Sequence, residues 1–496
     1  MNITIHTLGC KVNQYESQAI RSTLHQVGFT DTPPDESADV ILINSCTVTA
    51  VSDAKVRNLF RRSKAQNPHA VMVLTGCMPQ AFPEKIAKSF PDADIILGTK
   101  NRRALPEHIL RYLSTRQQII DIQPHEASEA FEPMSIDRFQ ERSRAFVKIQ
   151  DGCNRFCSYC IIPYARGRVR SKPLGQLLTE ITALGKKGYR EVVLTGINLS
   201  AYGQEMGLSL CDAVEAVCGI ADIARVRLGS LEPEGFSPEV IRRLAAQKKL
   251  CPQFHLSLQS GCDATLRRMN RHYTAAQYRA IVEALRAAFE NAAITTDIMV
   301  GFPGETPEEF QASLAFAQEI RFARTHVFAY SRRPGTKAYD APGQLSKECK
   351  IQRSHAMQAV AQASREAFFA AQMGRVEEIL LEQKAVPSKT DQPTQTAKET
   401  ARTDGPRRTA DPAQAADRRP QEAAVPETAP LMPKADCPSP AFVCYNGYTM
   451  NYSPVQVRLP CATEAFQGKI VSAKLSAYNS DHCFGALIEE SQDKST

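Results

Sequence analysis

The stretch Cys153-Asn154-Arg155-Phe156-Cys157-Ser158-Tyr159-Cys160 places three cysteines within eight residues. Soft thiolates are ligands of zinc and of iron–sulfur clusters, and a closed structural zinc site takes four protein ligands. Residues 161–175 contain neither Cys nor His that could complete such a site. The spacing therefore favours a cluster bound by three thiolates with one iron left open. A fortuitous group of cysteines, or half of a zinc ribbon, is the less favoured alternative.

Strand-like and helical patterns alternate around this stretch. The strand-like runs are 146–149, 191–195, 225–228, 254–258, 294–300 and 326–330, and the helical patterns between them include 174–187, 238–247, 273–289 and 307–320. A complete barrel has eight βα units, so six units predict an open, partial barrel whose active face lies at the carboxyl ends of its strands. The cysteine loop follows the first of these strands and should lie on that face. Later strands lead to Asn198, Glu232, Gly301 and Gly304, which should share it.

Near the N-terminus, three apolar runs are each followed by a cysteine. The runs 3–8, 40–43 and 71–74 lead to Cys10, Cys46 and Cys77, and helical patterns at 14–27 and 53–66 separate them. This order predicts an open parallel α/β sheet, in which the carboxyl ends of the strands share one edge. A lone cysteine is more often a small core residue than a ligand, but the repeated position favours convergence of these three thiols.

The remaining nine cysteines lack such a context, and we predict that they are packing residues. They are Cys211, Cys218, Cys251, Cys262, Cys349, Cys437, Cys444, Cys461 and Cys483.

The composition changes sharply after the predicted barrel. Residues 385–440 hold ten of the chain's 30 prolines and no aromatic residue, which predicts a disordered insert. The β-like runs 376–383, 442–459 and 469–475 flank it, so we expect one small antiparallel barrel that the insert interrupts. This module carries aromatic and polar residues suited to stacking on unpaired bases, although aromatics that simply fill a small core would give the same pattern. The residues are Tyr445, Tyr448, Tyr452, Asn446, Asn451 and Arg458.

Composition and charge narrow the class of protein further. Without a secretion signal, the 15 cysteines in 496 residues are better interpreted as reduced thiols than as disulfides. No stretch approaches the length of a membrane span, so we expect a cytoplasmic protein with no membrane partner. The net charge of +7 does not by itself indicate a nucleic-acid partner, but the basic clusters at 57–64 and 166–172 are compatible with one.

The cysteine loop, with an aromatic residue before its last Cys, resembles the cluster loop of the radical S-adenosylmethionine superfamily. Together with the second cysteine set and the small C-terminal β-module, it resembles the methylthiotransferases that modify tRNA or a ribosomal protein. The resemblance covers everything except the insert. It implies an N-terminal methylthiotransferase domain at 1–113, a radical barrel at 139–369, a TRAM-like RNA-binding module at 372–384 plus 441–490, and the insert at 385–440.

The resemblance also implies roles for the site residues. A [4Fe–4S] cluster on Cys153, Cys157 and Cys160 would cleave S-adenosylmethionine to methionine and a 5′-deoxyadenosyl radical, which could attack an unactivated C–H bond. A second [4Fe–4S] cluster on the N-terminal cysteines would have an iron free to carry the added sulfur. Tyr159 would pack on the adenine of the cofactor, and polar contacts would come from Asn198 and Glu232. Gly301 and Gly304 would line the adenine pocket.

The run Thr7-Leu8-Gly9-Cys10-Lys11-Val12-Asn13-Gln14-Tyr15-Glu16-Ser17 resembles the branch that acts on N6-threonylcarbamoyladenosine beside the anticodon. The isopentenyladenosine branch more usually shows Gln-Met-Asn after this Cys, and the ribosomal-protein branch shows Pro-Lys-Asn. The resemblance implies addition of a methylthio group to C2 of the base at position 37. The implied partners are tRNA, a sulfur donor, and an electron donor such as flavodoxin or ferredoxin.

The alternatives are the other two branches, a radical methylase, and a non-catalytic iron–sulfur protein that binds RNA. Structural metal sites are normally closed, which disfavours the non-catalytic protein. The second cysteine set disfavours a methylase that transfers carbon alone.

Overall fold

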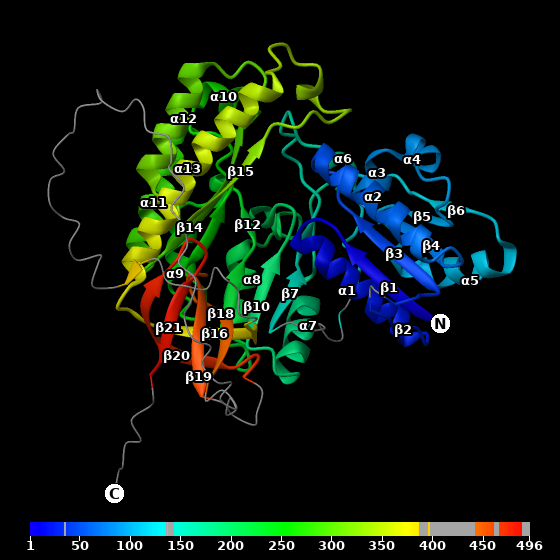
Figure 1. Ribbon diagram of the computed structural model, residues 1–496, viewed down its shortest axis with the longest axis horizontal. Coiled ribbons are helices and arrows are strands. Elements are labelled where there is room, and N and C mark those ends of the chain that lie inside the picture. The colour runs from blue at the N-terminus through cyan, green and yellow to red at the C-terminus, as the bar shows by residue number, and fades with distance from the viewer. Residues whose placement is uncertain are drawn as a thin grey trace, which may run out of the picture.

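The computed structural model describes residues 1–33, 36–134, 136, 143–385, 395–396, 442–460 and 466–488. Three parts follow one another along the chain (Figure 1): a parallel α/β sheet, an open parallel barrel, and a small β-barrel beneath the open barrel. The predicted fold class is confirmed. Within the described residues, no helix is both long and apolar enough to cross a membrane.

The N-terminal sheet has six parallel strands in the order β2-β1-β3-β4-β5-β6. The three predicted strands are present as β1 (Asn2–Thr7), β3 (Val40–Ser45) and β4 (Val71–Gly76). The added strands are β2 (Thr30–Asp31), β5 (Ile95–Leu97) and β6 (Ile119–Asp121), so the sheet continues beyond residue 113. Every residue of β3 and β4 is buried because helices cover both faces of the sheet.

Those covering helices divide into two pairs. The helices α1 (Lys11–Gln26) and α5 (Leu105–Thr115) pack on one face, and α2 (Ala50–Gln66) and α4 (Pro83–Ser89) pack on the other. The hydrophobic core on the α1 face continues into the barrel, and α1 also packs against the first barrel strand (Figure 1). The N-terminal domain is therefore joined to the barrel by a shared core.

The central part is a barrel of six parallel strand positions, as predicted. β11 (Arg225–Leu228) and the short β12 (Ser230–Leu231) follow each other with only Gly229 between them and count as one position. The strands are β7 (Arg144–Lys148), β10 (Glu191–Thr195), β11, β12, β13 (Gln253–Leu256), β14 (Ala293–Val300) and β15 (Arg324–Ala329). They form the sheets β11-β10-β7 and β12-β13-β14-β15, which the parallel bridge between Val226 and Leu250 connects. Because β7 and β15 do not pair, the barrel is open on one side.

Helices pack around these strands. They are α7 (Leu174–Lys186), α8 (Leu210–Cys218), α9 (Pro238–Ala245), α10 (Asp263–Arg268), α11 (Ala275–Ala288), α12 (Pro307–Ile320) and α13 (Lys347–Gln372). The long α13 packs along β15 and leads into the C-terminal module.

The C-terminal module is a closed barrel of five strands. They are β16 (Val376–Lys384), β18 (Phe442–Thr449), β19 (Pro454–Pro460), β20 (Ile470–Tyr478) and β21 (Cys483–Leu487). The barrel closes because β16 pairs with both β18 and β20. A turn divides the single predicted run 442–459 into two strands, and β21 had no counterpart in the sequence prediction. The pairing of β19 with β21 is parallel, whereas we predicted an antiparallel barrel throughout.

Most of the predicted insert, 385–440, lies outside the described residues, as do Cys437 and Cys461. Ala385 is described, and β17 (Gln395–Thr396) pairs with β20. The disorder of this insert therefore stays a prediction.

Candidate active site between two cysteine sets

The cysteine loop lies at the rim of the barrel between β8 (Gln150–Asp151) and α6 (Ile162–Arg166). Its three thiols, on Cys153, Cys157 and Cys160, are partly exposed. Local hydrogen bonds shape the loop: the Cys160 N–H donates to the Cys157 carbonyl at 2.9 Å, and the Cys153 N–H donates to the Gly167 carbonyl at 3.0 Å. The backbone of the loop is thus held by its own hydrogen bonds.

Burial dominates the electrostatics of the loop. Burial raises the pKa of the Cys153 thiol to about 11, and burial together with the nearby Cys157 raises the pKa of Cys160. Thiolate is the metal-binding form of cysteine, and bound iron would supply the positive charge that stabilises it. Three cysteines on one loop are the donor set that a cluster with one open iron requires.

Arg271 is a site residue that the sequence did not indicate. Its buried guanidinium places Nη1 3.4 Å from Cys157 Sγ and 3.3 Å from Glu232 Oε1, and it also donates to the Ser257 carbonyl at 3.0 Å. Burial raises the pKa of Glu232, and the charge of Arg271 opposes that effect. The structure therefore brings the predicted Glu232 to the cysteine loop through Arg271.

The other residues predicted to contact the cofactor lie in two separate regions. Tyr159 packs edge-on against Phe302 with ring centres 6.3 Å apart, beside Gly301 and Gly304, which have φ of +70° and +73°. Asn198 is 5% exposed, and its Oδ1 has no hydrogen-bond partner among the described residues. An orphaned buried acceptor is expected where a polar ligand belongs. Contact of these four residues with a cofactor stays a prediction.

The N-terminal cysteines follow three adjacent strands whose ends are in register. Thr7 pairs with Asn44, and Ser45 pairs with Gly76. Cys10 precedes α1, Cys46 follows β3, and Cys77 begins the short helix α3 (Cys77–Ala81).

The chain around these thiols is tightly packed. A Cβ on Gly9, which has φ of +118°, would lie 2.8 Å from Cys46 Cβ, so only glycine fits there. Burial raises the pKa of Cys77 to about 12; Arg166 opposes this, whereas Cys46 and Cys10 raise it further. The strand register places the three cysteines at one edge of the sheet, and their binding of a common cluster stays a prediction.

No three His, Cys, Asp or Glu side chains of the described residues form a cage for a single metal ion. A cluster makes a different demand, because each thiolate binds its own iron and the thiolates lie further apart than the ligands of one ion.

A buried charge network connects the two cysteine sets. Arg166 Nε lies 3.2 Å from Cys77 Sγ, and Arg166 Nη2 lies 2.9 Å from Glu16 Oε2. Glu16 also accepts from Lys148 at 3.0 Å and pairs with Arg102 at 2.6 Å. Lys148 in turn lies 3.0 Å from Asp151, two residues before Cys153. The network spans the interface between the N-terminal domain and the barrel.

The basic cluster at 166–172 therefore has a different role from the one that the sequence suggested. Arg166, Arg170 and Lys172 are buried, while Arg168 is exposed. Most of this charge binds protein carboxylates and carbonyls and is not available to a nucleic acid. The basic residues at 57–64 remain available to a partner, because Arg57, Arg61 and Arg62 are exposed on α2.

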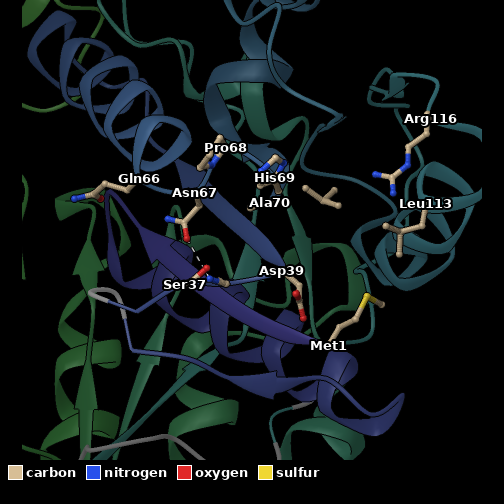
Figure 2. A pocket seen from close by; sticks show the side chains of 12 residues that line it. Met1, Ser37, Asp39, Gln66, Asn67, Pro68, His69, Ala70, Leu113 and Arg116 are labelled. Atoms are coloured by element: carbon tan, nitrogen blue, oxygen red, sulfur yellow. Dashed lines mark hydrogen bonds between the residues drawn. The ribbon is translucent and has the colours of Figure 1, made fainter.

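A cavity of about 300 Å³ lies in the N-terminal domain (Figure 2). Met1, Asp39 and Ala70, which line it, precede β1, β3 and β4, whereas the cysteines follow those strands. The cavity is therefore at the opposite edge of the sheet and is not part of the candidate active site.

Comparisons with known proteins agree with this geometry. Residues 147–317 match the radical SAM superfamily, and residues 2–98 match a family described as "Uncharacterized protein family UPF0004". A "Threonylcarbamoyladenosine tRNA methylthiotransferase MtaB" of Thermotoga maritima is 38% identical over 352 residues, which are 71% of this chain and 80% of the relative. The chain belongs to the tRNA methylthiotransferase family.

Another relative of this methylthiotransferase is a "tRNA-2-methylthio-N(6)-dimethylallyladenosine synthase" of Pelotomaculum thermopropionicum. It is also 38% identical, over 360 residues that cover 71% of this chain and 80% of the relative. Overall identity therefore does not separate the two substrate branches. The structure of the radical S-adenosylmethionine methyltransferase TsrM from Kitasatospora setae has a TM-score of 0.51 at 15% identity, and the match covers 68% of this chain and 77% of TsrM. That likeness concerns the fold alone.

The family establishes the general chemistry of this methylthiotransferase. It is a radical enzyme that uses S-adenosylmethionine and [4Fe–4S] clusters, and its substrate class is tRNA. The family resemblance drawn from the sequence is confirmed. The alternative of a non-catalytic RNA-binding protein is wrong.

Proposed function

We propose that this methylthiotransferase adds a methylthio group to C2 of N6-threonylcarbamoyladenosine at position 37 of tRNA. One [4Fe–4S] cluster is held by Cys153, Cys157 and Cys160, and a second is held by the N-terminal cysteines. The observation that carries this proposal is the placement of two three-thiol sets in neighbouring domains, with a buried charge network between them. A second cluster site has a clear use in sulfur transfer and none in transfer of carbon alone.

The bound clusters and S-adenosylmethionine supply reductive cleavage and sulfur transfer. The residues of this chain hold and orient them. Three thiolates on the rim loop leave one coordination position open, and the Arg271 guanidinium beside Cys157 stabilises negative charge at that loop. Asn198 offers a buried acceptor, while Tyr159 and Phe302 form an apolar wall. The reaction also requires an electron donor such as flavodoxin or ferredoxin, and a sulfur donor.

The TRAM-like module binds RNA in this proposal, but with different aromatic residues from those that the sequence suggested. Tyr448 and Tyr452 stack on each other with ring centres 4.5 Å apart, and Arg144 of β7 lies over both rings. They join the module to the barrel. The Arg458 guanidinium lies 4.2 Å from the ring centre of the exposed Phe442, and this pair is better suited to contact a base and a phosphate.

Lys11 supports the threonylcarbamoyl branch. It directly follows Cys10, and its ammonium lies 6.0 Å from the ring centre of Tyr452. It forms no hydrogen bond or ion pair with any residue in the described part of the chain. Burial and the nearby Arg144 and Arg227 lower the pKa of Lys11, so an anionic ligand would stabilise its charged form. The threonylcarbamoyl substituent carries a carboxylate, whereas the isopentenyl substituent carries no charge.

We expect Lys11→Gln to lower kcat/KM for tRNA that carries threonylcarbamoyladenosine by about tenfold or more, the usual effect of losing a hydrogen bond to a charged group. Cleavage of S-adenosylmethionine without tRNA should not change. Lys11→Arg should keep most of the activity, and Lys55→Gln on α2 serves as the control for loss of a surface charge. A loss no greater for Lys11→Gln than for Lys55→Gln would contradict recognition of the carboxylate.

We expect the anaerobically reconstituted chain to bind about eight irons as two four-iron clusters. Combined replacement of Cys153, Cys157 and Cys160 with alanine should leave about four, because the second set lies in another domain. Iron analysis and the visible absorption spectrum provide the measurement. Cys262→Ala with Cys349→Ala is the matched control, since both thiols are partly exposed and belong to neither set. Loss of all iron, or of none, in the triple variant would refute the assignment of two sites.

A further inference from the structure

We infer that Arg166, a residue of the barrel domain, is a positioning residue for the cluster of the N-terminal domain and raises the reduction potential of that cluster. This inference rests on the proposed assignment of a cluster to Cys10, Cys46 and Cys77. It gives a role to a buried arginine that is not itself a proposed cluster ligand.

The Arg166 guanidinium is held on several sides. Its Nε lies 3.2 Å from Cys77 Sγ, and its Nη2 lies 2.7 Å from Asn13 Oδ1 and 2.9 Å from Glu16 Oε2. Nη1 also binds Glu16. Arg166 is 0% exposed, so it cannot turn toward solvent without breaking these contacts. The N–H that faces Cys77 is therefore fixed in direction.

Arg166 also lies close in the chain to the radical-cluster loop. It follows Cys160 by six residues and is the last residue of α6. The helix α6 packs against α3, which begins at Cys77, and the Cys153 N–H donates to Gly167, the residue after Arg166. One short segment thus contacts both cysteine sets. A displacement of the barrel loop would move the hydrogen-bond donor of the N-terminal site.

The direction of the effect follows from charge. Reduction adds an electron to a cluster, and a nearby positive charge stabilises the more negative reduced form. A hydrogen bond from an ionised donor is roughly twice as strong as a neutral one, and burial removes most of the screening by water. Hydrogen bonds to the sulfur atoms and solvent exposure are known determinants of cluster potentials. Removing the Arg166 charge should therefore make the N-terminal cluster harder to reduce.

The experiment isolates the N-terminal cluster in the full-length chain by replacing Cys153, Cys157 and Cys160 with alanine. Arg166→Gln is added to this parent, the clusters are reconstituted, and a redox titration is followed by electron paramagnetic resonance. We expect the reduction equilibrium to shift at least about tenfold toward the oxidised form, which is about 59 mV for one electron. Arg102→Gln is the matched control, because Arg102 is equally buried and binds the same Glu16.

Arg102→Gln should shift the potential much less, since Arg102 binds Glu16 and Glu132 and not a cysteine sulfur. Arg166→Lys keeps the positive charge with a shorter reach, so its potential should lie between those of the parent and Arg166→Gln. It also serves as the decisive variant if Arg166→Gln does not fold by circular dichroism. Equal reduction potentials for the parent and both Arg166 variants would overturn the role of Arg166 and leave the proposed cluster site standing. A parent that binds no iron would overturn the proposed cluster site itself.

Discussion

Replacing Cys10, Cys46 and Cys77 together with alanine should abolish the methylthio product while leaving cleavage of S-adenosylmethionine in place. The thiols for the cleavage step lie on the barrel loop, which has its own hydrogen bonds and its own Arg271 contact. The sulfur to be transferred has no other predicted carrier. Reverse-phase chromatography would measure 5′-deoxyadenosine and methionine, and mass spectrometry of digested tRNA would measure the modified nucleoside.

The matched control for that variant is the alanine replacement of Cys153, Cys157 and Cys160, which should lose both cleavage and product. Buried cysteines contribute to core packing in addition to any metal binding, and their replacement can disturb the fold. Circular dichroism should therefore establish that both variants are folded. Continued formation of the methylthio nucleoside by the N-terminal variant would exclude these three thiols as the sulfur-carrying site. Loss of cleavage in that variant would show that the two sites are not separable in this way.

Glu16→Gln should destabilise the protein by about 3–5 kcal/mol, the usual cost of leaving buried charges without their partner. Glu16 is 0% exposed, and its carboxylate contacts Arg102, Lys148 and Arg166. The amide of glutamine would remove the buried carboxylate that these three cations share, leaving Arg102 with Glu132 and leaving Lys148 and Arg166 with Asp151. Urea unfolding followed by circular dichroism measures the change. Glu319→Gln is the control, because its pair with Arg279 is exposed and should contribute little.

The same pair of variants gives a pH test. Burial by itself would raise the pKa of Glu16, but the charges of Arg102, Arg166 and Lys148 hold it well below the ordinary value. A carboxylate with a depressed pKa stabilises the folded state fully above its unfolded pKa, and this contribution is lost as the pH falls toward the folded pKa. The difference in stability between the parent and Glu16→Gln should thus be largest near neutral pH and shrink in acid. A constant difference across that range would contradict an ionised Glu16.

Local patterns in the chain were sufficient for the main elements of the fold. β10, β11 and α12 begin and end where the apolar periodicity predicted, because a buried parallel strand and an amphipathic helix each leave a period in the sequence. The spacing of Cys153, Cys157 and Cys160 predicted a cluster loop because the three cysteines are close in sequence. The N-terminal cysteines could be grouped because parallel strands end at one edge of a sheet.

By contrast, only the tertiary structure determined which side chains lie next to the thiols. Arg166 and Cys77 are 89 residues apart in the chain, and Arg271 and Cys157 are 114 residues apart. An arginine within a basic cluster has the same local sequence whether it faces solvent or a buried carboxylate. The N-terminal domain packs on the barrel and buries the Arg166 guanidinium, so its charge must be compensated. Only the folded chain specifies that its partners are Glu16 and Cys77.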